Sequence, residues 1–503
     1  MPADQLLLEH HSQNAQWRKE GENGKYEEFK EEWFTQPLNH FSPEHANTTF
    51  EQRYWVNSRH YKAGGPVIIL DGGETSGEDR LPFLDTGIVD ILAKATHGLG
   101  IVLEHRYYGK SIPVQNFSTD ALRFLNNAQS LQDSAQFISN FQWEGVGLSG
   151  SKNGTKWIYY GGSYAGARAA HMRVLYPNIV WGSIASSAVT HAAIDYWEYN
   201  EAIRLTANQT CIRLLVSSVE YIDTLLSSHV PFVSRNLKAL FGLDALDTED
   251  FASVLSEPLG YVQMQNWDHP SGSGGSEGDP DGEGVSLWSR FCGILGEGNG
   301  VRSKWAWVRR RAATHNYAKW IKEEIVSNCA DGNVTRCFGT SDASKYRSTD
   351  LQHTWRAWVW QVCNEWGYFI GAPPDPLYPR IVSKYLTLDY TSQICRQAFP
   401  DGQWARVPEW PNVTAVNVLG DYNLAEDRLA FVDGDEDPWR PATPHSWHAT
   451  PRRDSIVRPF KIIHSAVHHY DENGLRDHSK EPKRIQTIHE QEVKFVKSWL
   501  EMA

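Results

Sequence analysis

Residues 159–170 read YYGGSYAGARAA and place Ser163 between small residues. An aromatic, β-like run precedes this serine, and an alanine-rich, helix-like run follows it. A strand, a tight turn carrying serine and a helix are the context of a nucleophile elbow, in which the helix N-terminus stabilises developing negative charge. Ala165 stands where G-x-S-x-G has its second glycine, but alanine is the next smallest side chain. The stretch therefore predicts a strand-to-helix turn with Ser163 as candidate nucleophile. A serine in an ordinary turn is the alternative.

Apolar runs of strand length recur on both sides of this stretch. They are continuous and rich in β-branched residues rather than alternating, as the buried strands of a parallel sheet require. The runs lie within 66–73, 99–111, 180–188, 427–439 and 457–469. Because strands alternate with helical segments, the sequence predicts an α/β fold with a mostly parallel sheet.

A long block of helical periodicity interrupts the strand pattern. It contains all six cysteines and a Gly-, Ser-, Asp- and Pro-rich stretch at 266–288, which is typical of a surface loop. The sequence therefore predicts a polar N-terminal arm, a first part of the α/β core, a helical insertion and a second part of the core. The predicted boundaries are 1–33, 34–189, 190–409 and 410–503.

The charge balance argues against nucleic-acid binding. The 503 residues carry a formal net charge of −13 at pH 7, and no basic run stands out. The sequence also has no apolar stretch long enough to cross a bilayer. We therefore expect neither a nucleic acid nor a membrane among the partners.

Cysteine usage and glycosylation sequons both point to an oxidising compartment. Six cysteines fit three disulfides, and none shows CxxC or zinc-finger spacing, so we expect no metal site. The cysteines are Cys211, Cys292, Cys329, Cys337, Cys363 and Cys395. Sequons begin at Asn47, Asn116, Asn153, Asn208, Asn333 and Asn412. Together they predict a secreted or lysosomal/vacuolar glycoprotein, although the polar N-terminus lacks the apolar core of a signal peptide.

The two C-terminal strand-like runs supply partners for a serine nucleophile. Serine needs a histidine to take its proton and a carboxylate to orient that histidine, in the chain order Ser, Asp or Glu, His. FVDGDEDPW offers acids after one run, and HSAVHHYD offers histidines after the next. The candidates are Asp433, Asp435, Glu436, Asp437, His464, His468 and His469. Oxyanion stabilisation would come from the Tyr164 N–H and from a donor in the Gly72–Gly73 loop.

These motifs together resemble one family of serine peptidases, which includes lysosomal Pro-X carboxypeptidase, dipeptidyl-peptidase II and the secreted fungal prolyl endopeptidases. The resemblance extends from about residue 34 to the C-terminus, with its motifs in order. It is carried by FTQPLNHF with TTFEQRYW, by EHRYYGKS, by GGSYAG, by DGDEDPW and by AVHHYD. It implies an α/β-hydrolase fold with a large helical cap domain inserted before the strand that carries the catalytic aspartate.

The resemblance also implies roles for individual residues. Ser163 matches the nucleophile, Asp437 the catalytic acid and His468 the base. Trp439 matches a tryptophan that walls a proline pocket, and Glu74 matches a loop acid near the substrate. Ala167 stands where a larger pocket residue can occur, which would widen the pocket or leave it to other aromatic residues, such as Trp360 or Trp366.

The disulfide pairing follows from the resemblance as well. The flanks of Cys363 and Cys395 resemble those of a family disulfide, and with that pair assigned we expect Cys211–Cys292 and Cys329–Cys337. The sequence alone leaves the connectivity open, because six cysteines allow fifteen pairings.

The predicted function is hydrolysis of peptide bonds on the C-terminal side of proline, through an acyl-enzyme and without a cofactor. Proline-containing peptides or proteins would be the substrates. The sequence leaves open whether the enzyme is an endopeptidase, a carboxypeptidase or a dipeptidyl-peptidase, and whether it forms a homodimer. Alternatives are an esterase or lipase of the same fold, since fold does not fix substrate, and an inactive binding protein that keeps the fold.

Overall fold

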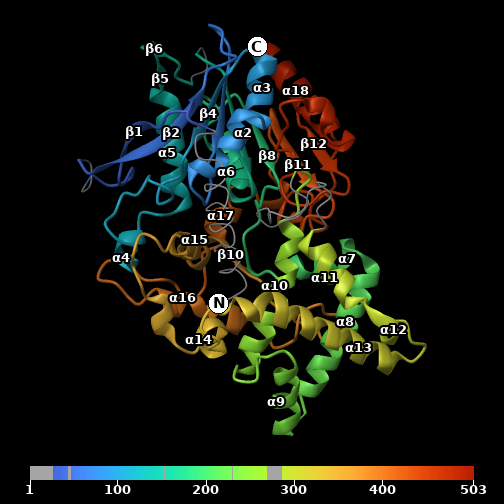
Figure 1. Ribbon diagram of the computed structural model, residues 1–503. Coiled ribbons are helices and arrows are strands. Elements are labelled where there is room, and N and C mark those ends of the chain that lie inside the picture. The colour runs from blue at the N-terminus through green and yellow to red at the C-terminus, as the bar shows by residue number, and fades with distance from the viewer. Residues whose placement is uncertain (1–25, 44–46, 151–153, 229, 269–285, 503) are drawn as a thin grey trace. The chain divides into compact units, whose positions relative to one another are not determined.

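The computed structural model describes residues 26–43, 47–150, 154–228, 230–268 and 286–502 (Figure 1). The described chain forms two compact units. The sheet unit contains the described residues up to Ile194, together with Thr349–Gly367 and 399–502. The helical unit contains the described residues of Asp195–Ser348 and Tyr368–Ala398. The helical insertion expected at 190–409 is therefore not one body, because Thr349–Gly367 and 399–409 group with the sheet.

The sheet unit is built on eight strands in the order β1-β2-β4-β3-β7-β8-β11-β12. β1 pairs with β2 and β2 with β4 in antiparallel fashion, and every other neighbour pair is parallel. The bounds are β1 Glu32–Pro37, β2 Thr49–Asn57, β3 Val67–Asp71, β4 Leu99–Leu103, β7 Trp157–Gly162, β8 Gly182–Ser186, β11 Leu429–Gly434 and β12 Phe460–Ile463. This order and polarity are those of the α/β-hydrolase fold, as predicted.

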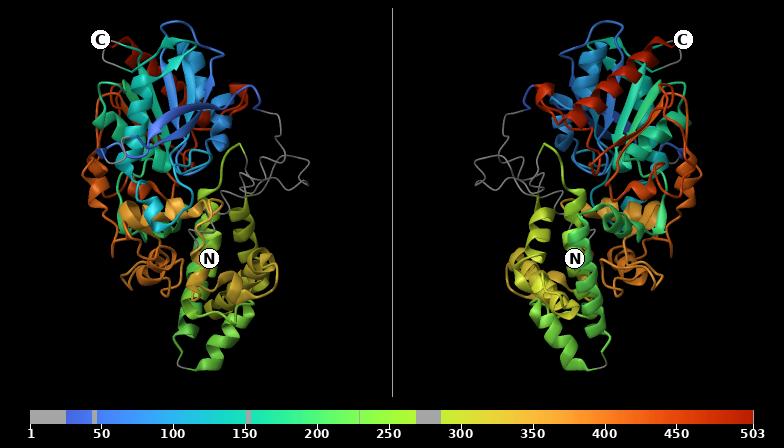
Figure 2. Two further views of the ribbon diagram at one scale, coloured as in Figure 1. Left: turned by 90° about the vertical axis from the view of Figure 1, so that its left-hand side faces the viewer. Right: turned by 90° about the vertical axis from the view of Figure 1, so that its right-hand side faces the viewer.

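Helices cover both faces of this sheet (Figure 2). On one face α5 (Asn127–Asn140) packs with α6 (Ser163–Leu175), and their apolar side chains join those of the strands in one hydrophobic core. On the other face α3 (Ile88–Thr96) packs against α18 (Lys483–Glu501). Every residue of β3, β4, β7, β8 and β11 is buried, which explains why these strands are mostly apolar or small rather than alternating between apolar and polar residues.

Shorter elements complete the sheet unit. They are α2 Leu81–Asp85, α4 Thr119–Leu122, β5 Gln142–Trp143, β6 Val146–Gly147, α15 Trp355–Gln361 and α17 Thr414–Asn417. Two short strands, β9 (Ala193–Asp195) and β10 (Gly367–Phe369), contain points at which the chain passes from one unit to the other.

The helical unit contains the longest helices between the two halves of the sheet. They are α7 Glu198–Thr206, α8 Gln209–Leu226, α9 Pro231–Leu240, α10 Thr248–Gln263, α11 Leu287–Leu295, α12 Gly298–Val301, α13 Ala306–Trp320, α14 Val334–Phe338 and α16 Leu388–Ala398. α8, α11 and α13 pack on one another, and the Cys211–Cys292 disulfide joins α8 to α11. Most of the predicted polar loop, residues 269–285, lies outside the described residues. Among the described helices, none combines the length and apolar character that crossing a membrane requires.

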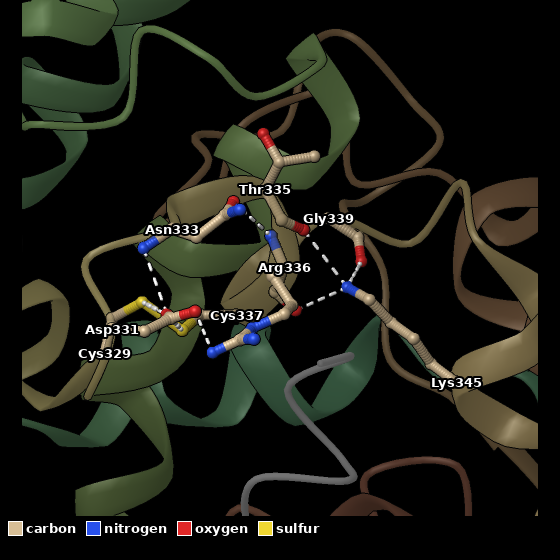
Figure 3. Close-up of a disulfide and its surroundings, with 8 residues drawn as sticks. All are labelled: Cys329, Asp331, Asn333, Thr335, Arg336, Cys337, Gly339 and Lys345. Carbon is tan, nitrogen blue, oxygen red and sulfur yellow. Dashed lines mark hydrogen bonds and ion pairs between the residues drawn. A yellow bond between two sulfur atoms is a disulfide. The ribbon is translucent and has the colours of Figure 1, made fainter.

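A second disulfide closes a small loop in the helical unit (Figure 3). Cys329 bonds to Cys337, and Asp331 inside the loop accepts from the Asn333 N–H and pairs with Arg336. The Lys345 ammonium donates to the carbonyl groups at the end of α14, including that of Gly339 at 2.7 Å. The Cys211–Cys292 and Cys329–Cys337 disulfides were both predicted. Cys363 and Cys395 are also disulfide-bonded, and no free cysteine remains.

The predicted glycosylation sites lie on the surface wherever the structure describes them. The exposed sequon asparagines are Asn47, Asn116, Asn208, Asn333 and Asn412. Asn153 lies outside the described residues. Asn333 also caps α14, accepting from the Arg336 N–H at 3.0 Å through its side-chain oxygen. Because that bond uses the oxygen, the side-chain nitrogen that a glycan would modify remains outside this interaction.

Two of the sequence motifs have structural roles close to the sheet. Glu104 of EHRYYGKS is fully buried and accepts from Arg53 at 2.6 Å and from the Gly77 N–H at 2.9 Å. It also accepts from both the N–H and the hydroxyl of Ser111. His40 of FTQPLNHF lies 2.6 Å from Asp133, which also binds the guanidinium of Arg106. These buried charges are paired, as burial requires. The motifs thus fix the loops around the carboxyl edge of the sheet.

Candidate active site

Ser163 occupies a strained turn between β7 and α6. It is the first residue of α6, and its φ of 59° lies in the left-handed region that side chains with a Cβ rarely adopt. Neither preceding glycine can carry a side chain. A Cβ at Gly161 would lie 2.0 Å from the Ala165 carbonyl oxygen, and one at Gly162 would lie 2.2 Å from a Glu472 carboxylate oxygen. This is the geometry of a nucleophile elbow rather than of an ordinary turn.

The alanine at position 165 faces the loop after β3. A Cβ placed on Gly73 of this loop would lie 3.4 Å from the Ala165 methyl group, which is ordinary van der Waals contact. Gly73 has a φ of +65°, so a side chain there would be strained for that reason. The Ala165 methyl group is buried in the fold, so the elbow holds alanine at the position of the second glycine of the pattern.

His468 and Asp437 form a buried pair. The Nδ1 atom of His468 lies 2.9 Å from Asp437 Oδ2 and 3.1 Å from Oδ1. Burial by itself would raise the pKa of Asp437, but the His468 ring, the Trp439 N–H and the Ser187 hydroxyl together hold that pKa below its usual value. Asp437 is therefore the ionised partner. Because a carboxylate only accepts, Nδ1 of His468 carries the proton of this bond.

The other ring nitrogen of His468 is left for chemistry. Nε2 is buried and makes no hydrogen bond to any described residue. With Nδ1–H donating to Asp437, Nε2 of the neutral ring is a proton acceptor. A buried acceptor without a partner is unfavourable in a structural histidine, but it suits a general base.

Sheet register brings the three predicted triad residues to neighbouring strand ends. β7, β8, β11 and β12 are consecutive in the sheet and parallel. Gly162 pairs with Ser186 across β7 and β8, and Gly434 pairs with Ile463 across β11 and β12. Ser163, Asp437 and His468 follow these strand ends, at the carboxyl edge where α/β sheets place their ligands. A bond from the His469 N–H to the Ser187 hydroxyl, at 2.9 Å, ties the histidine loop to the end of β8.

The loop after β3 does not offer the oxyanion donor that the sequence predicted. The Gly72 N–H donates to the Leu103 carbonyl at 2.8 Å, and the Gly73 N–H donates to Asp71 Oδ1 at 3.0 Å. Both glycine amides are therefore engaged within the fold, so the prediction of Gly73 is corrected. The next amide in the loop, that of Glu74, donates to the carboxylate of its own side chain, so it does not replace Gly73 as the candidate. Tyr164 keeps its place in the first turn of α6, where N–H groups have no partner within the helix.

A buried ion pair fixes this loop to α6. Asp71, the last residue of β3, accepts from Arg168 Nε at 2.7 Å and from the Tyr159 hydroxyl at 2.5 Å. Burial would raise the pKa of Asp71, but Arg168, His105 and the bonds from Tyr159 and Gly73 together hold that pKa below its usual value. The carboxylate of Asp71 thus binds both the Gly73 N–H and Arg168, and so connects the loop after β3 to the helix that begins at Ser163.

The tryptophans predicted to line a pocket have different environments. Trp439 is half-buried, with its ring centroid 6.3 Å from that of His468. Trp366 is fully buried and packs edge-on against the Tyr164 ring at 5.0 Å. Trp360 packs on Phe399 and donates to the Leu125 carbonyl. Trp439 therefore remains a candidate for contact with substrate, whereas Trp360 and Trp366 are 4% and 0% exposed and belong to the core.

One aromatic residue near the elbow was not predicted. Trp358 is half-buried, and its ring lies 5.3 Å from that of Tyr164. The Tyr164 hydroxyl is held by Gln361, also on α15, at 2.7 Å and by His105 at 3.1 Å. Both Trp358 and Trp360 stand on α15, so only the rotation of this helix decides which of them is near the elbow. The sequence carried no signal for that rotation.

Charged groups gather around the elbow and the histidine pair. His469 and Glu472 are 3.0 Å apart. Burial opposes their charges, but each favours the charged form of the other, so the pKa of His469 is raised and that of Glu472 is lowered. Glu74 is a half-buried loop acid whose pKa burial raises, although Arg80 and the two histidines oppose this. Sequence reasoning named Glu74 but missed Glu472 and Arg80, since neither lies in a motif that carries chemistry.

Asp471, which is close to Glu472, forms a pair of neighbouring acids with Glu492. Asp471 accepts from the Tyr160 hydroxyl at 2.6 Å and from the Ser186 hydroxyl at 2.5 Å. Burial raises the pKa of Asp471, and burial together with the neighbouring Asp471 raises that of Glu492 in α18 well above its usual value. An acid with a raised pKa binds its proton more tightly in the folded state. Its contribution to stability is therefore greatest below the unfolded pKa of about 4 and falls as the pH rises toward the folded value.

The pair predicts a pH-dependent effect of Glu492→Gln. The amide stays neutral, so the variant should match the wild type near pH 4.5 and exceed its stability near pH 7.5 by roughly 1–3 kcal/mol. Apparent melting temperatures of both proteins between these pH values would test this. Glu490→Gln, on an exposed site of the same helix, is the control and should show no such trend. A constant difference between wild type and Glu492→Gln at all pH values would contradict the assignment.

Comparisons with known proteins show the family of the chain. The family model described as "Serine carboxypeptidase S28" matches residues 36–489. A "Probable extracellular serine carboxypeptidase" of Arthroderma benhamiae is 39% identical over 93% of this chain and 67% of its own length. "Serine protease vicPa" of Bipolaris victoriae is 30% identical over 84% of this chain and 80% of its own. The "Thymus-specific serine protease" of Mus musculus is 27% identical over 89% and 83%. The chain therefore belongs to the S28 family of serine carboxypeptidases.

Proposed function

We propose that this serine peptidase is secreted and cleaves on the C-terminal side of proline, with Ser163, His468 and Asp437 as its triad. The observation that carries the proposal is the buried His468–Asp437 pair, whose free Nε2 belongs to the loop after β12. Strained Ser163 follows a strand of the same carboxyl edge. A secreted location is supported by the extracellular relative, by the disulfides and by the exposed sequons.

The proposed chemistry proceeds in two steps. In the first, Ser163 Oγ attacks the carbonyl carbon of the proline residue while His468 Nε2 takes the hydroxyl proton and then gives it to the leaving amine. In the second, water attacks the acyl-enzyme with His468 again as base, which releases the new carboxylate and restores Ser163. Asp437 stabilises the imidazolium formed in each step. The N–H group of Tyr164, in the first turn of α6, would stabilise the oxyanion.

Proline selectivity would come from aromatic side chains beside the triad. The proline ring is apolar and its nitrogen carries no hydrogen in a peptide, so a wall of aromatic surface recognises it without a hydrogen-bond donor or acceptor. The backbone N–H of Trp439 donates to Asp437 at 2.8 Å, which places this residue beside the triad. Trp358 lies on the Tyr164 side of the elbow. The two rings are the candidates for this wall.

Replacing Trp439 by alanine should weaken proline selectivity while leaving the triad in place. We expect the ratio of kcat/KM for a proline substrate to that for the matching alanine substrate to fall about tenfold. Peptides that differ only at that residue would measure it. Trp404→Ala removes a tryptophan that is 71% exposed in the same unit and serves as the control. An unchanged ratio for Trp439→Ala would remove this residue from the pocket.

We further propose carboxypeptidase action, with Arg80 binding the terminal carboxylate of the substrate. Arg80 is anchored by its Nε–H, which donates to the Gly72 carbonyl at 3.1 Å. One of its terminal nitrogens lies 3.7 Å from the position of a Cβ on Gly73, so its charge is beside the Gly73 loop. A guanidinium in such a place suits a carboxylate. The A. benhamiae relative, named as a carboxypeptidase, supports the same mode of action.

Two blocked peptides separate the possible modes of action. Both carry an N-terminal block and end in Pro-Phe, one as the free acid and the other as the amide. A carboxypeptidase should cleave the acid much faster, and Arg80→Gln should raise KM for the acid but not for the amide. Equal cleavage of both would indicate an endopeptidase, and cleavage only of peptides with a free N-terminus would indicate a dipeptidyl-peptidase. Mass spectrometry of the products identifies the bond, and turnover of a simple ester alone would favour an esterase.

A further inference from the structure

Two imidazoles and a carboxylate meet in the C-terminal part of the sheet unit, away from the triad in sequence. The Nδ1 atom of His478 lies 2.8 Å from Glu481 Oε1, and the Nδ1 atom of His489 lies 3.0 Å from Glu481 Oε2. One ligand atom from each of the three residues lies within 4.8 Å of the other two. Glu481 and His489 are buried, whereas His478 is partly open to solvent. Two of the three possible metal ligands are therefore held in the interior, and the third can be reached from solvent.

The orientation of His489 is that of a metal ligand. Its Nε2 lies 3.0 Å from the Asp471 carbonyl oxygen. Because a carbonyl only accepts, Nε2 carries a hydrogen, and Nδ1 is the ring nitrogen that faces the Glu481 carboxylate. Nδ1 and the carboxylate oxygen are thus directed at the same point, where an ion could replace the proton that joins them. Imidazoles that bind metals commonly donate their second N–H to a backbone carbonyl in this way.

The Glu481 carboxylate is itself held in place. Its Oε1 accepts from the Leu475 N–H at 3.0 Å. The carboxylate is therefore oriented before any ion arrives. On the far side of His489, Asp471 and Glu492 add acidic groups rather than cationic ones.

We propose that His478, Glu481 and His489 bind one divalent transition-metal ion of the zinc class. Two ligands that are each about 2.1 Å from a tetrahedral metal ion lie about 3.4 Å apart, so each nitrogen–oxygen pair would need to open by only about half an ångström to admit an ion. Two imidazoles with one carboxylate favour zinc, nickel, cobalt or copper over calcium and magnesium, which prefer oxygen ligands only. Water on the open side of His478 would complete the coordination.

The role of this ion would be to hold the histidine loop. The loop runs from β12 through His468 to Asp471, whose carbonyl group accepts from His489 of α18. A metal on His489 would fix the ring that holds this carbonyl, three residues beyond the proposed base. The site departs from the expectation of no metal. Its ligands are too far apart in sequence, at 478, 481 and 489, to form a recognisable zinc motif, and only the fold brings α18 against the preceding loop.

Metal analysis of the full chain, prepared without a histidine tag, tests the proposal. After dialysis against zinc and then against metal-free buffer, we expect one zinc per chain by mass spectrometry of the elements, and a higher apparent melting temperature with zinc than without it. His478→Asn changes the most exposed ligand and should fold. It should weaken zinc binding at least about 100-fold in a chelator competition, as should Glu481→Gln. His60→Asn is the matched control, because His60 also lies 2.9 Å from a carboxylate, that of Asp90, but outside any described three-ligand cluster.

Each outcome decides the question. Saturable binding that is lost in His478→Asn and Glu481→Gln but kept in His60→Asn supports the site. Absence of saturable binding by the wild type overturns it, and so does binding that both ligand variants retain. In the wild type the measurement needs no variant to fold and no peptidase activity, so the site can fail while the proposed function stands.

Discussion

Ser163→Ala should fold as the wild type does and lose peptidase turnover by a factor of about 10⁶. The variant removes only the oxygen that would form the acyl-enzyme. Alanine keeps the Cβ, so the strain at the φ of 59° is the same as with serine and stability should change little. Turnover of a proline-containing chromogenic peptide measures the loss, and circular dichroism verifies the fold.

Ser465→Ala provides the matched control for this variant. Ser465 is also a serine with a left-handed φ, of 52°, and it is exposed in the turn after β12. Its replacement changes the same atoms in the same backbone conformation without removing the proposed nucleophile, so activity should stay close to that of the wild type. Turnover by Ser163→Ala within about tenfold of the wild type would contradict the assignment, since loss of a nucleophile costs far more.

His468→Ala should lose activity to nearly the same extent as Ser163→Ala, because an unactivated serine hydroxyl is a poor nucleophile. His469→Gln should cost much less, on the order of 100-fold or below, since His469 is paired with Glu472 and acts only through the charge near the site. Asp437→Asn should lose about 10⁴-fold, because an amide cannot stabilise the imidazolium and favours the wrong tautomer of His468.

The comparison of the adjacent histidines is the informative one. The two rings stand on the same loop, with centroids 4.5 Å apart; that of His468 is buried beside Asp437, and that of His469 is half-buried beside Glu472. Measured kcat/KM values over a range of pH, with melting temperatures of each variant, separate a catalytic loss from a folding defect. Activity that survives in His468→Ala but not in His469→Gln would reverse the two roles.

Much of the fold could be predicted because the sequence pattern has a direct physical cause. Strands buried on both faces must be continuously apolar, so 66–73, 99–111 and 180–188 were recognisable. The strained turn requires small residues, so Gly161 and Gly162 marked the elbow. Disulfide pairing was different in kind, because it came from a resemblance to a known family.

Other parts of the site could not be predicted because they depend on contacts made only in the fold. The Gly73 amide was assigned to the oxyanion, but the Asp71 side chain accepts its hydrogen. Trp360 was chosen in place of Trp358 because helix rotation is not encoded in a short run of aromatic residues. The boundary of the insertion was misplaced since Thr349–Gly367, although helical, packs with the sheet.

Labelling with a fluorophosphonate probe tests the central claim most directly, because the reagent reacts with an activated serine whatever the peptide specificity. We predict one adduct per chain, found by mass spectrometry on the peptide that contains Ser163. The adduct should be absent from Ser163→Ala and strongly reduced in His468→Ala. A wild-type protein that cleaves peptides but remains unlabelled, or that carries the adduct on another serine, would contradict the account.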